Sequence, residues 1–482
     1  MKNNNKKWSL ENTYLNLPDC FYEKIKPRFV QNPKIIYYNK NLAKNLNLEF
    51  LNNDTSLITN YFSGNKLPEN SKPIAQAYAG HQFGHFTMLG DGRAILLGEQ
   101  RDLNSKLYDI QLKGSGKTSF SRGGDGRATL SSMLREYIIS ESMHHLKIPT
   151  SRSLAVIDTG EKVYRESTRN GGVLTRIASS HIRVGTFEYG RHFCSKEDFQ
   201  KFIDYVIKRH YPKILNHESP YLELLKIIMK KQIDLIINWI RVGFIHGVMN
   251  TDNMSISGET IDYGPCAFIN TYNPQTVFSS IDRSGRYAFG NQHKIAYWNL
   301  TVFAGTLLPF IENDKDKAIQ LAQNILNHFS IEYSNKWHQM MYKKLGIINP
   351  IDEDKLLIKH LLTLMESYKS DYTNIFAALT LNKPYKDSLL NSSEFDDWKK
   401  KWKKRIKNEN YSYKIMQENN PIYIPRNHLV ESALKNAING NKNEFDKLLN
   451  LMSHTYNYDI KHDQFQTIPK GFDESYKTFC GT

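Results

Sequence analysis

The chain has 482 residues, enough to bury a large core and, by length alone, to form two or three domains. No segment reaches the roughly 18 apolar residues that span a bilayer, and no apolar run follows the basic start, so neither a membrane protein nor a secretory signal is expected. Four scattered cysteines without CxxC spacing argue against a zinc site and against a disulfide-built scaffold. These features predict a cytoplasmic protein.

The first part of the chain mixes strands and helices. Residues 93–99 and 107–113 are short apolar or alternating runs, which predict two paired strands, and Asp91-Gly92 predicts a turn before the first. Apolar residues at helical spacing predict a helix from Ala128 to about His145. Further strands are expected near residues 153–157 and 172–176.

From about residue 196 the pattern becomes helical. A long apolar-striped helix is expected over residues 221–240, and later helices over 314–329, 352–368, 394–407 and 429–438. We therefore predict an α+β, bilobal, protein-kinase-like fold. Its sheet-containing N-lobe would cover residues 1–185, and its mostly helical C-lobe would cover residues 186–482.

The net charge of +15 raises the possibility of nucleic-acid binding. The sharpest signal is the segment 398–405, in which two tryptophans alternate with lysines. The alternative is a lysine-rich helix whose residues Trp398, Trp402 and Ile406 pack inward at i, i+4 and i+8. The helical spacing favours the second interpretation, and no nucleic-acid partner is expected.

One segment near the middle of the chain resembles the catalytic and metal-binding motifs of a protein kinase. Kinases carry His-Arg-Asp, then Asn, and later Asp-Phe-Gly. Here His246 and Asn253 have the kinase separation, and residues 262–264 read Asp-Tyr-Gly. The position of the kinase catalytic Asp is Val248, which cannot accept a proton. Either the chain binds a nucleotide without turning it over, or another group such as Asp252 does that work.

Several residues upstream suit the binding of a nucleotide phosphate. Lys113 ends a predicted strand and Glu136 lies within a predicted helix, the arrangement by which kinases hold their phosphate-binding lysine. Glycine-rich turns at residues 90–93 and 123–127 place backbone N–H groups beside an arginine. The segment 114–118 lacks the first glycine of a P-loop, which disfavours that class of NTPase.

Two histidines, His81 and His85, have the i, i+4 spacing of metal ligands. No third ligand is apparent in the sequence, so local packing is the favoured interpretation. Arg176 and Arg183 could each bind a phosphate with a forked guanidinium, or could form surface ion pairs.

These motifs together resemble the selenoprotein O family. The matching blocks occur in order between about residues 70 and 300, and they lie at residues 80–86, 90–93, 111–116, 123–128, 174–186, 246–253 and 262–266. Members of that family have a pseudokinase fold and transfer AMP, rather than phosphate, from ATP to hydroxyl groups of proteins. Bacterial members are described as protein nucleotidyltransferases that also use UTP, and the family binds ATP inverted relative to kinases.

The resemblance implies a role for each matching residue. Asp252 would be the proton acceptor, Glu136 would brace Lys113, and Asn253 and Asp262 would hold Mg²⁺ or Mn²⁺. Contacts to the nucleotide would come from Gly90, Gly92, Arg93, Lys113, Asp125, Gly126, Arg176, Arg183 and Asp262. The expected partners are ATP and the acceptor proteins.

The family also often carries a Cys or selenocysteine near its C-terminus, which leads to a hypothesis about Cys266 and Cys480. They could form a reversible disulfide that senses redox state beside the active site, or they could be two independent thiols in a reducing cytosol. Two other functions stay open from the sequence: a kinase that transfers the γ-phosphoryl group, and a nucleotide-binding scaffold without activity.

Overall fold

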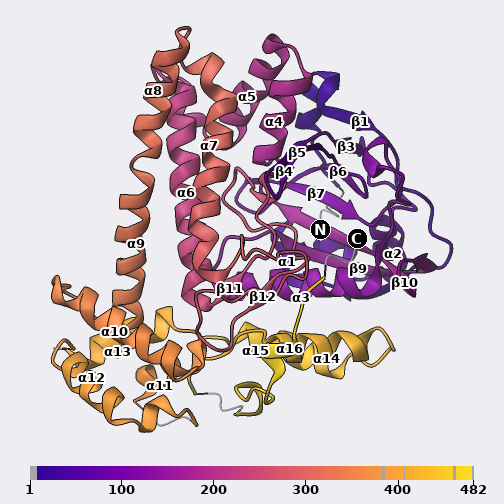
Figure 1. Ribbon diagram of the computed structural model, residues 1–482. Coiled ribbons are helices and arrows are strands. Elements are labelled where there is room, and N and C mark those ends of the chain that lie inside the picture. The colour runs from indigo at the N-terminus through magenta and orange to yellow at the C-terminus, as the bar shows by residue number, and fades with distance from the viewer. Residues whose placement is uncertain (1–7, 383–385, 407, 460–462, 480–482) are drawn as a thin grey trace, which may run out of the picture.

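A computed structural model describes residues 8–382, 386–406, 408–459 and 463–479 (Figure 1). The strands are β1 (Tyr22–Lys24), β2 (Lys34–Tyr38), β3 (Ile74–Gln76), β4 (Ala79–Gln82), β5 (His85–Met88), β6 (Ala94–Arg101), β7 (Leu107–Lys113), β8 (Ala128–Thr129), β9 (Arg152–Tyr164), β10 (Thr168–Ala178), β11 (Phe244–Ile245) and β12 (Ala267–Phe268).

The helices alternate with these strands at first and then follow one another. They are α1 (Lys40–Asn45), α2 (Thr55–Ser63), α3 (Leu130–His145), α4 (Val184–Phe193), α5 (Lys196–His210), α6 (Pro220–Val242), α7 (Gln292–Ile311), α8 (Lys315–Leu326), α9 (Phe329–Lys344), α10 (Glu353–Ser367), α11 (Tyr372–Leu381), α12 (Ser393–Lys403), α13 (Glu409–Asn419), α14 (Asn427–Ala437), α15 (Asn443–Ser453) and α16 (Phe472–Ser475).

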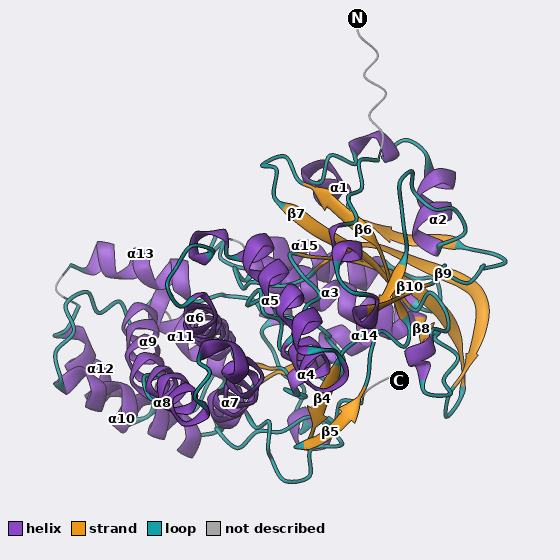
Figure 2. Ribbon diagram, turned by 90° about the horizontal axis from the view of Figure 1, so that it is seen from above, coloured by secondary structure: helices purple, strands orange, loops and turns teal. Residues whose placement is uncertain are grey.

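The largest sheet is antiparallel and has the strand order β1-β3-β6-β7-β10-β9-β2, with β8 paired to β10. Strands β6 to β10 of this sheet are labelled in Figure 2. Residues alternate between the two faces of a strand, and β7 has a different character on each face. Its apolar residues Ile110 and Leu112 pack into a core with α1 and α2 on one face. Asp109, Gln111 and Lys113 therefore point to the opposite face, toward α3 and the helical part of the molecule.

Helix α3 covers that second face by packing against β9 and β10. It begins at Leu130 because the preceding Thr129 accepts a hydrogen bond from the Ser132 N–H, a favourable N-cap. Its residues Leu134, Ile138 and Met143 are fully buried in the main core. The helix thereby places Glu136 beneath the end of β7.

The rest of the molecule is helical, with α6, α7, α8 and α9 standing as a bundle beside the sheet (Figure 1). The last long helices return to the N-terminal part, because α14 and α15 both pack on α3. On β2, the Tyr37 ring stacks on Phe445 with centroids 4.6 Å apart, and its hydroxyl donates to Asp446 at 2.8 Å. The ends of the chain therefore stabilise one another.

The predicted α+β class, with a sheet-bearing N-terminal part and a helical C-terminal part, is confirmed. The lobe boundary between residues 185 and 186 stays a prediction. Trp398, Trp402 and Ile406 are buried, as the helical interpretation of the lysine-rich segment requires. Among the described residues, no helix is both long and apolar enough to cross a membrane.

Helix α7 and a cysteine pair are among the features of the fold that were not predicted. Helix α7 was missed because apolar residues occur on most of its sides, as in a helix packed within a bundle, and therefore form no single apolar stripe in the sequence. The sulfur atoms of Cys20 and Cys194 lie at disulfide distance, with Cα atoms 6.2 Å apart. This pair joins the start of the chain to the end of α4, whereas the cysteine spacing suggested no disulfide, because spacing cannot reveal contacts across 174 residues.

Candidate active site

A buried cluster of charges lies where β7, α3 and β10 meet the Asp-Tyr-Gly segment. Lys113 Nζ lies 2.7 Å from Glu136 Oε2 and 2.8 Å from Asp262 Oδ1. Arg176 on β10 reaches the same two carboxylates, at 2.6 and 2.7 Å. Arg183, at the start of α4, lies 3.4 Å from Asp262 Oδ2. The structure thus brings together five residues that the sequence singled out.

The electrostatics of this cluster keep its members charged. Burial alone would raise the pKa of Glu136, but the charges of Arg176 and Lys113 lower it below the ordinary value. The pKa of Asp262 falls well below its ordinary value, because Arg176, Lys113 and Arg183 outweigh the effect of burial. Lys113, Arg176 and Arg183 thus converge on one place, where the buried carboxylates Asp91 and Asp252 also offset the charge of Arg183. Converging cations of this kind suit the binding of phosphate oxygens.

Asp252 lies next to this cluster, on the short helical turn 251–253. Arg183 donates to its backbone carbonyl at 3.2 Å. Its side chain is buried, and Oδ1 has no hydrogen-bond partner among the described residues. Burial, together with the nearby carboxylates Asp262 and Glu188, raises the pKa of Asp252 to about 7 against the opposing charge of Arg183. A carboxylate with this pKa can accept a proton near neutral pH.

Asn253 and Val248 occupy neighbouring places in the same loop. Asn253 Nδ2 donates to the Val248 carbonyl at 3.0 Å, so its Oδ1 is turned away from that bond and can accept from another group. The Val248 side chain is buried. Asp262 has a backbone φ of +61°, an unusual conformation for a residue with a side chain, which marks the Asp-Tyr-Gly turn as a constrained position.

The glycine-rich loop at residues 90–93 packs tightly against the loop that follows β7 and contains Phe120. A side chain at Gly90 would come within 2.3 Å of the Phe120 ring, and one at Gly92 within 2.7 Å of the Phe120 carbonyl oxygen. Thr118 Oγ1 donates to the Asp91 carbonyl at 2.8 Å. The half-buried Arg93 makes no ion pair within the described part of the chain. This leaves its guanidinium available to a ligand.

Asp125 and Gly126 lie apart from the charge cluster. Asp125 forms a bidentate pair with Arg165, at 2.9 and 3.0 Å, and makes no contact with Lys113. Gly126 has a φ of +68°, and a side chain there would come within 2.1 Å of the Gly116 carbonyl oxygen. Their predicted contacts with the nucleotide stay a prediction, and the structure assigns them a role in shaping the loop.

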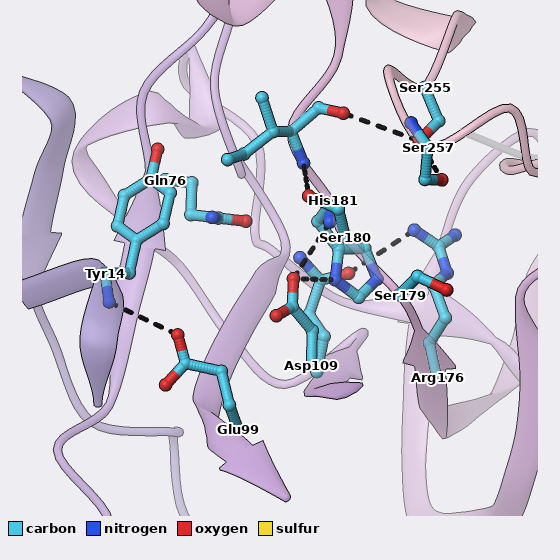
Figure 3. Close-up of polar contacts among 12 residues, drawn as sticks. Tyr14, Gln76, Glu99, Asp109, Arg176, Ser179, Ser180, His181, Ser255 and Ser257 are labelled. Atoms are coloured by element: carbon cyan, nitrogen blue, oxygen red, sulfur yellow. Dashed lines mark hydrogen bonds and ion pairs between the residues drawn. The ribbon is translucent and has the colours of Figure 1, made fainter. Parts of the chain in front are cut away.

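A second buried network supports the cluster and was missed by the sequence reasoning. Asp109 accepts hydrogen bonds from the His181 backbone N–H at 2.8 Å and from its ring at 3.1 Å (Figure 3). Arg209 on α5 pairs with Asp109 and also with Glu99, 3.2 Å away. The His181 carbonyl then accepts from Arg183 Nε at 3.1 Å. This network holds Arg183 in place. Because side chains alternate between the two faces of β7, Asp109 lies on the same face as Lys113.

The two histidines flagged as possible metal ligands have different surroundings. The His81 ring pairs with Glu188 on α4, as expected for local packing, whereas His85 is exposed. No cluster of three or more His, Cys, Asp or Glu side chains that could hold a metal occurs in the part of the chain that the structure describes.

The chain is similar to known proteins over nearly its whole length. The sequence profile of the family described as "Protein adenylyltransferase SelO" matches residues 5–453. Proteins named "Protein nucleotidyltransferase YdiU" are 52% identical over 481 residues in Clostridium perfringens strain SM101, covering 98% of each chain. The protein of that name from Bacillus thuringiensis subsp. konkukian is 51% identical over 488 residues, covering 100% of each chain. Because the match extends over nearly the whole length and includes the Lys113, Glu136 and Asp262 cluster, this chain belongs to the SelO family of protein adenylyltransferases.

Proposed function

We propose that the chain transfers AMP from ATP, with UTP as an alternative donor of UMP, to Ser, Thr or Tyr hydroxyls of other proteins. The observation that carries this proposal is the buried Asp252 beside an intact Lys113, Glu136 and Asp262 cluster, while Val248 occupies the kinase base position. The curated relatives bear names that state the same type of reaction.

In the proposed reaction, Asp252 accepts the proton of the acceptor hydroxyl. The hydroxyl oxygen then bonds to the α-phosphorus as the bond to the pyrophosphate oxygen breaks. Lys113, Arg176 and Arg183 would stabilise the negative charge on the departing pyrophosphate. A kinase mechanism needs a proton acceptor at position 248, which the valine cannot provide.

The residues present fit a divalent cation bound together with a nucleotide. Mg²⁺ and Mn²⁺ prefer oxygen ligands, and Mg²⁺ is commonly held by one or two protein side chains plus phosphate oxygens. The Asp262 carboxylate and the Asn253 Oδ1 offer such oxygens, and the Val248 carbonyl fixes the orientation of the Asn253 amide. When bound, the ion would neutralise charge on the phosphates. The inverted orientation of ATP implied by the family stays a prediction.

Intact-mass spectrometry tests the proposed chemistry. The purified protein and a mixed set of acceptor proteins are incubated with ATP or UTP and with Mg²⁺ or Mn²⁺, and adducts are mapped to residues. We expect adducts with the mass of AMP or UMP on hydroxyl side chains, none of which form when EDTA is present. Adducts with the mass of a phosphoryl group alone would contradict the proposal.

A redox link between Cys266 and Cys480 is a further part of this proposal. Cys480 lies outside the described residues, but the tail just before it packs beside Cys266: Thr478 Oγ1 donates to the Pro265 carbonyl at 2.7 Å. Disulfide mapping after mild oxidation is expected to recover the Cys266–Cys480 peptide pair. Recovery of both as unlinked thiols would contradict the link. The cytoplasmic location stays a prediction, which cell fractionation would check.

A further inference from the structure

The hairpin β4–β5 lies directly against the proposed proton acceptor. A side chain at Gly80 on β4 would come within 2.6 Å of Asp252 Oδ1. The absence of a Cβ at Gly185, on α4, allows the same close approach, because a side chain there would lie 2.0 Å from the Ala79 carbonyl oxygen. The hairpin thus forms one wall of the site from which the acceptor hydroxyl must lose its proton.

The tip of the hairpin is anchored to the loop that carries Asp252. Phe83 and Gly84 both have positive φ, of 51° and 92°, which gives a turn whose twist matches that of the two strands. The Phe83 N–H donates to Asn250 Oδ1 at 3.1 Å, and the Tyr287 hydroxyl donates to the same oxygen at 2.6 Å. Because Asn250 precedes Asp252 by two residues, the hairpin and the loop form one unit.

The outer edge of β5 presents backbone groups that point away from the hairpin. The Leu89 N–H donates to the Tyr78 carbonyl at 3.1 Å, so Tyr78–Leu89 is a hydrogen-bonded pair. Hydrogen-bonded and non-hydrogen-bonded pairs alternate along an antiparallel ladder, so Gly80–Thr87 and Gln82–His85 are hydrogen-bonded as well. The N–H and C=O groups of Phe86 and Met88 therefore point away from β4. Within the described residues, β5 pairs with no strand other than β4.

One face of this edge is apolar and open to solvent. Phe86 and Met88 are 39% and 48% exposed, on the face opposite to Gly80 and Asp252. Phe193, at the end of α4, is 47% exposed and stacks on Phe86, with centroids 6.2 Å apart. In Figure 2 the hairpin lies at the margin of the molecule, next to α4. We call Phe86, Met88 and Phe193 the β5 apolar face.

We propose that the free edge of β5 binds an extended segment of the acceptor protein as an additional strand, an inference that rests on the proposed function. β-Strand addition takes its affinity from backbone hydrogen bonds and its specificity from alternate side chains. Residues on one side of the added segment would contact the β5 apolar face. Residues on the other side would point to the Asp252 side of the hairpin. At its end, β5 continues into the loop Gly90–Arg93, so the added segment runs alongside the chain that enters the proposed phosphate site.

This geometry favours acceptor segments in which apolar residues alternate with hydroxyl residues. The probe is a synthetic peptide in which valine alternates with tyrosine, threonine and serine, with aspartates at both ends for solubility. Its control has the same composition with the valines in one block. A third peptide carries O-methylated hydroxyls, which cannot accept a nucleotide but can still bind.

The experiment measures label transfer from ATP labelled at the α-phosphate, with the full chain and three variants. Met88→Pro removes the outward N–H of β5, the double change Phe86→Ser with Met88→Ser removes the β5 apolar face, and Leu103→Ser is the control at an exposed apolar residue of another turn. We expect both to raise the KM for the alternating peptide by roughly three- to tenfold, Met88→Pro through one lost hydrogen bond and the double change through lost apolar contact, with kcat and ATP affinity unchanged. Leu103→Ser should behave as the unaltered chain.

Equal KM values for all variants, or for the alternating and block peptides, would overturn the proposal. So would a dimer in sedimentation that Met88→Pro dissociates, because the edge would then belong to a second copy of the chain. Fluorescence anisotropy with the O-methylated peptide separates this inference from the proposed function. Binding weakened by Met88→Pro supports the docking edge even if no label is transferred, and no difference in binding rejects it.

Discussion

Glu136 is the residue that holds the charge cluster together, because both Lys113 and Arg176 pair with it in a buried environment. Its own side chain is 3% exposed. Removing one partner from a buried ion pair leaves the other charges without compensation, which is far more costly than losing a pair at the surface.

We predict that Glu136→Ala lowers the free energy of unfolding by about 3–5 kcal/mol and lowers the rate of nucleotide transfer as well, since Lys113 loses its brace. The matched control is Glu11→Ala, which removes an exposed carboxylate paired with the exposed Arg101 and should cost less than about 1 kcal/mol. Urea unfolding of both variants measures the difference. Equal losses of stability would show that the Glu136 pairs are no stronger than a surface pair.

The sequence predicted most residues of the charge cluster around Lys113 but not the second network that supports it. Lys113 and Glu136 could be paired because a strand end and a helix middle are kinase-like positions. Asp109, Arg209 and His181 were missed, since Arg209 reaches Asp109 from a helix a hundred residues away. Such long-range pairing depends on how the elements pack, which residue spacing does not encode.

Among the elements, the hairpin β4–β5 meets helix α4 at Gly185 and meets Asp252 at Gly80, and these two contacts set how closely the three approach one another. Both are helix or strand positions where glycine is otherwise unfavourable, because it adds backbone entropy to the unfolded chain. The close contacts at Gly80 and Gly185 explain why a larger residue does not fit. The sequence did not predict the hairpin, because Phe83-Gly84 is not among the usual turn pairs.

We predict that Gly185→Ala lowers transfer activity by displacing β4 from the loop of Asp252, since the new Cβ would lie 2.0 Å from a backbone oxygen. The control is Gly305→Ala in α7, where nothing lies within 4 Å of the added Cβ. That change should leave activity unaltered and stabilise the helix by about 0.5–1 kcal/mol. Rates and thermal unfolding of both variants check this. Full activity in Gly185→Ala would rule out a close fit at this contact.

At the scale of the whole molecule, the C-terminal helices bind back onto the N-terminal part through Tyr37, Phe445 and Asp446. The α+β class and the order of sheet and helices followed from the sequence pattern. The return of α14 and α15 to α3 did not, because an amphipathic helix shows which face is buried but not the surface it packs on.

Stability of the whole molecule should depend on pH through histidines such as the partly buried His210, at the end of α5. Burial, with the adjacent Arg209 charge, lowers its pKa to about 3 from an ordinary value near 6.5. Only the unfolded chain binds this proton between those values, so the stabilisation is present above pH 6.5 and is lost as pH falls toward 3.

We predict that His210→Gln makes the free energy of unfolding less dependent on pH between pH 6 and about 4, because unfolding of the variant takes up one proton fewer in that range. Denaturant unfolding at several pH values measures the slope, and the exposed His360→Gln is the control. Parallel pH profiles for the unaltered chain and His210→Gln would contradict a neutral, partly buried His210.

We propose that the chain transfers a nucleotidyl group and not a phosphoryl group to its acceptors. One measurement decides it: the purified protein receives ATP labelled at the α-phosphate or at the γ-phosphate, with Mg²⁺ or Mn²⁺, and acid-stable label on proteins is counted. We predict label from the α position alone, reduced roughly 100-fold or more in Asp262→Ala, which removes a proposed metal ligand. Label from the γ position alone would make the chain a kinase and contradict the account.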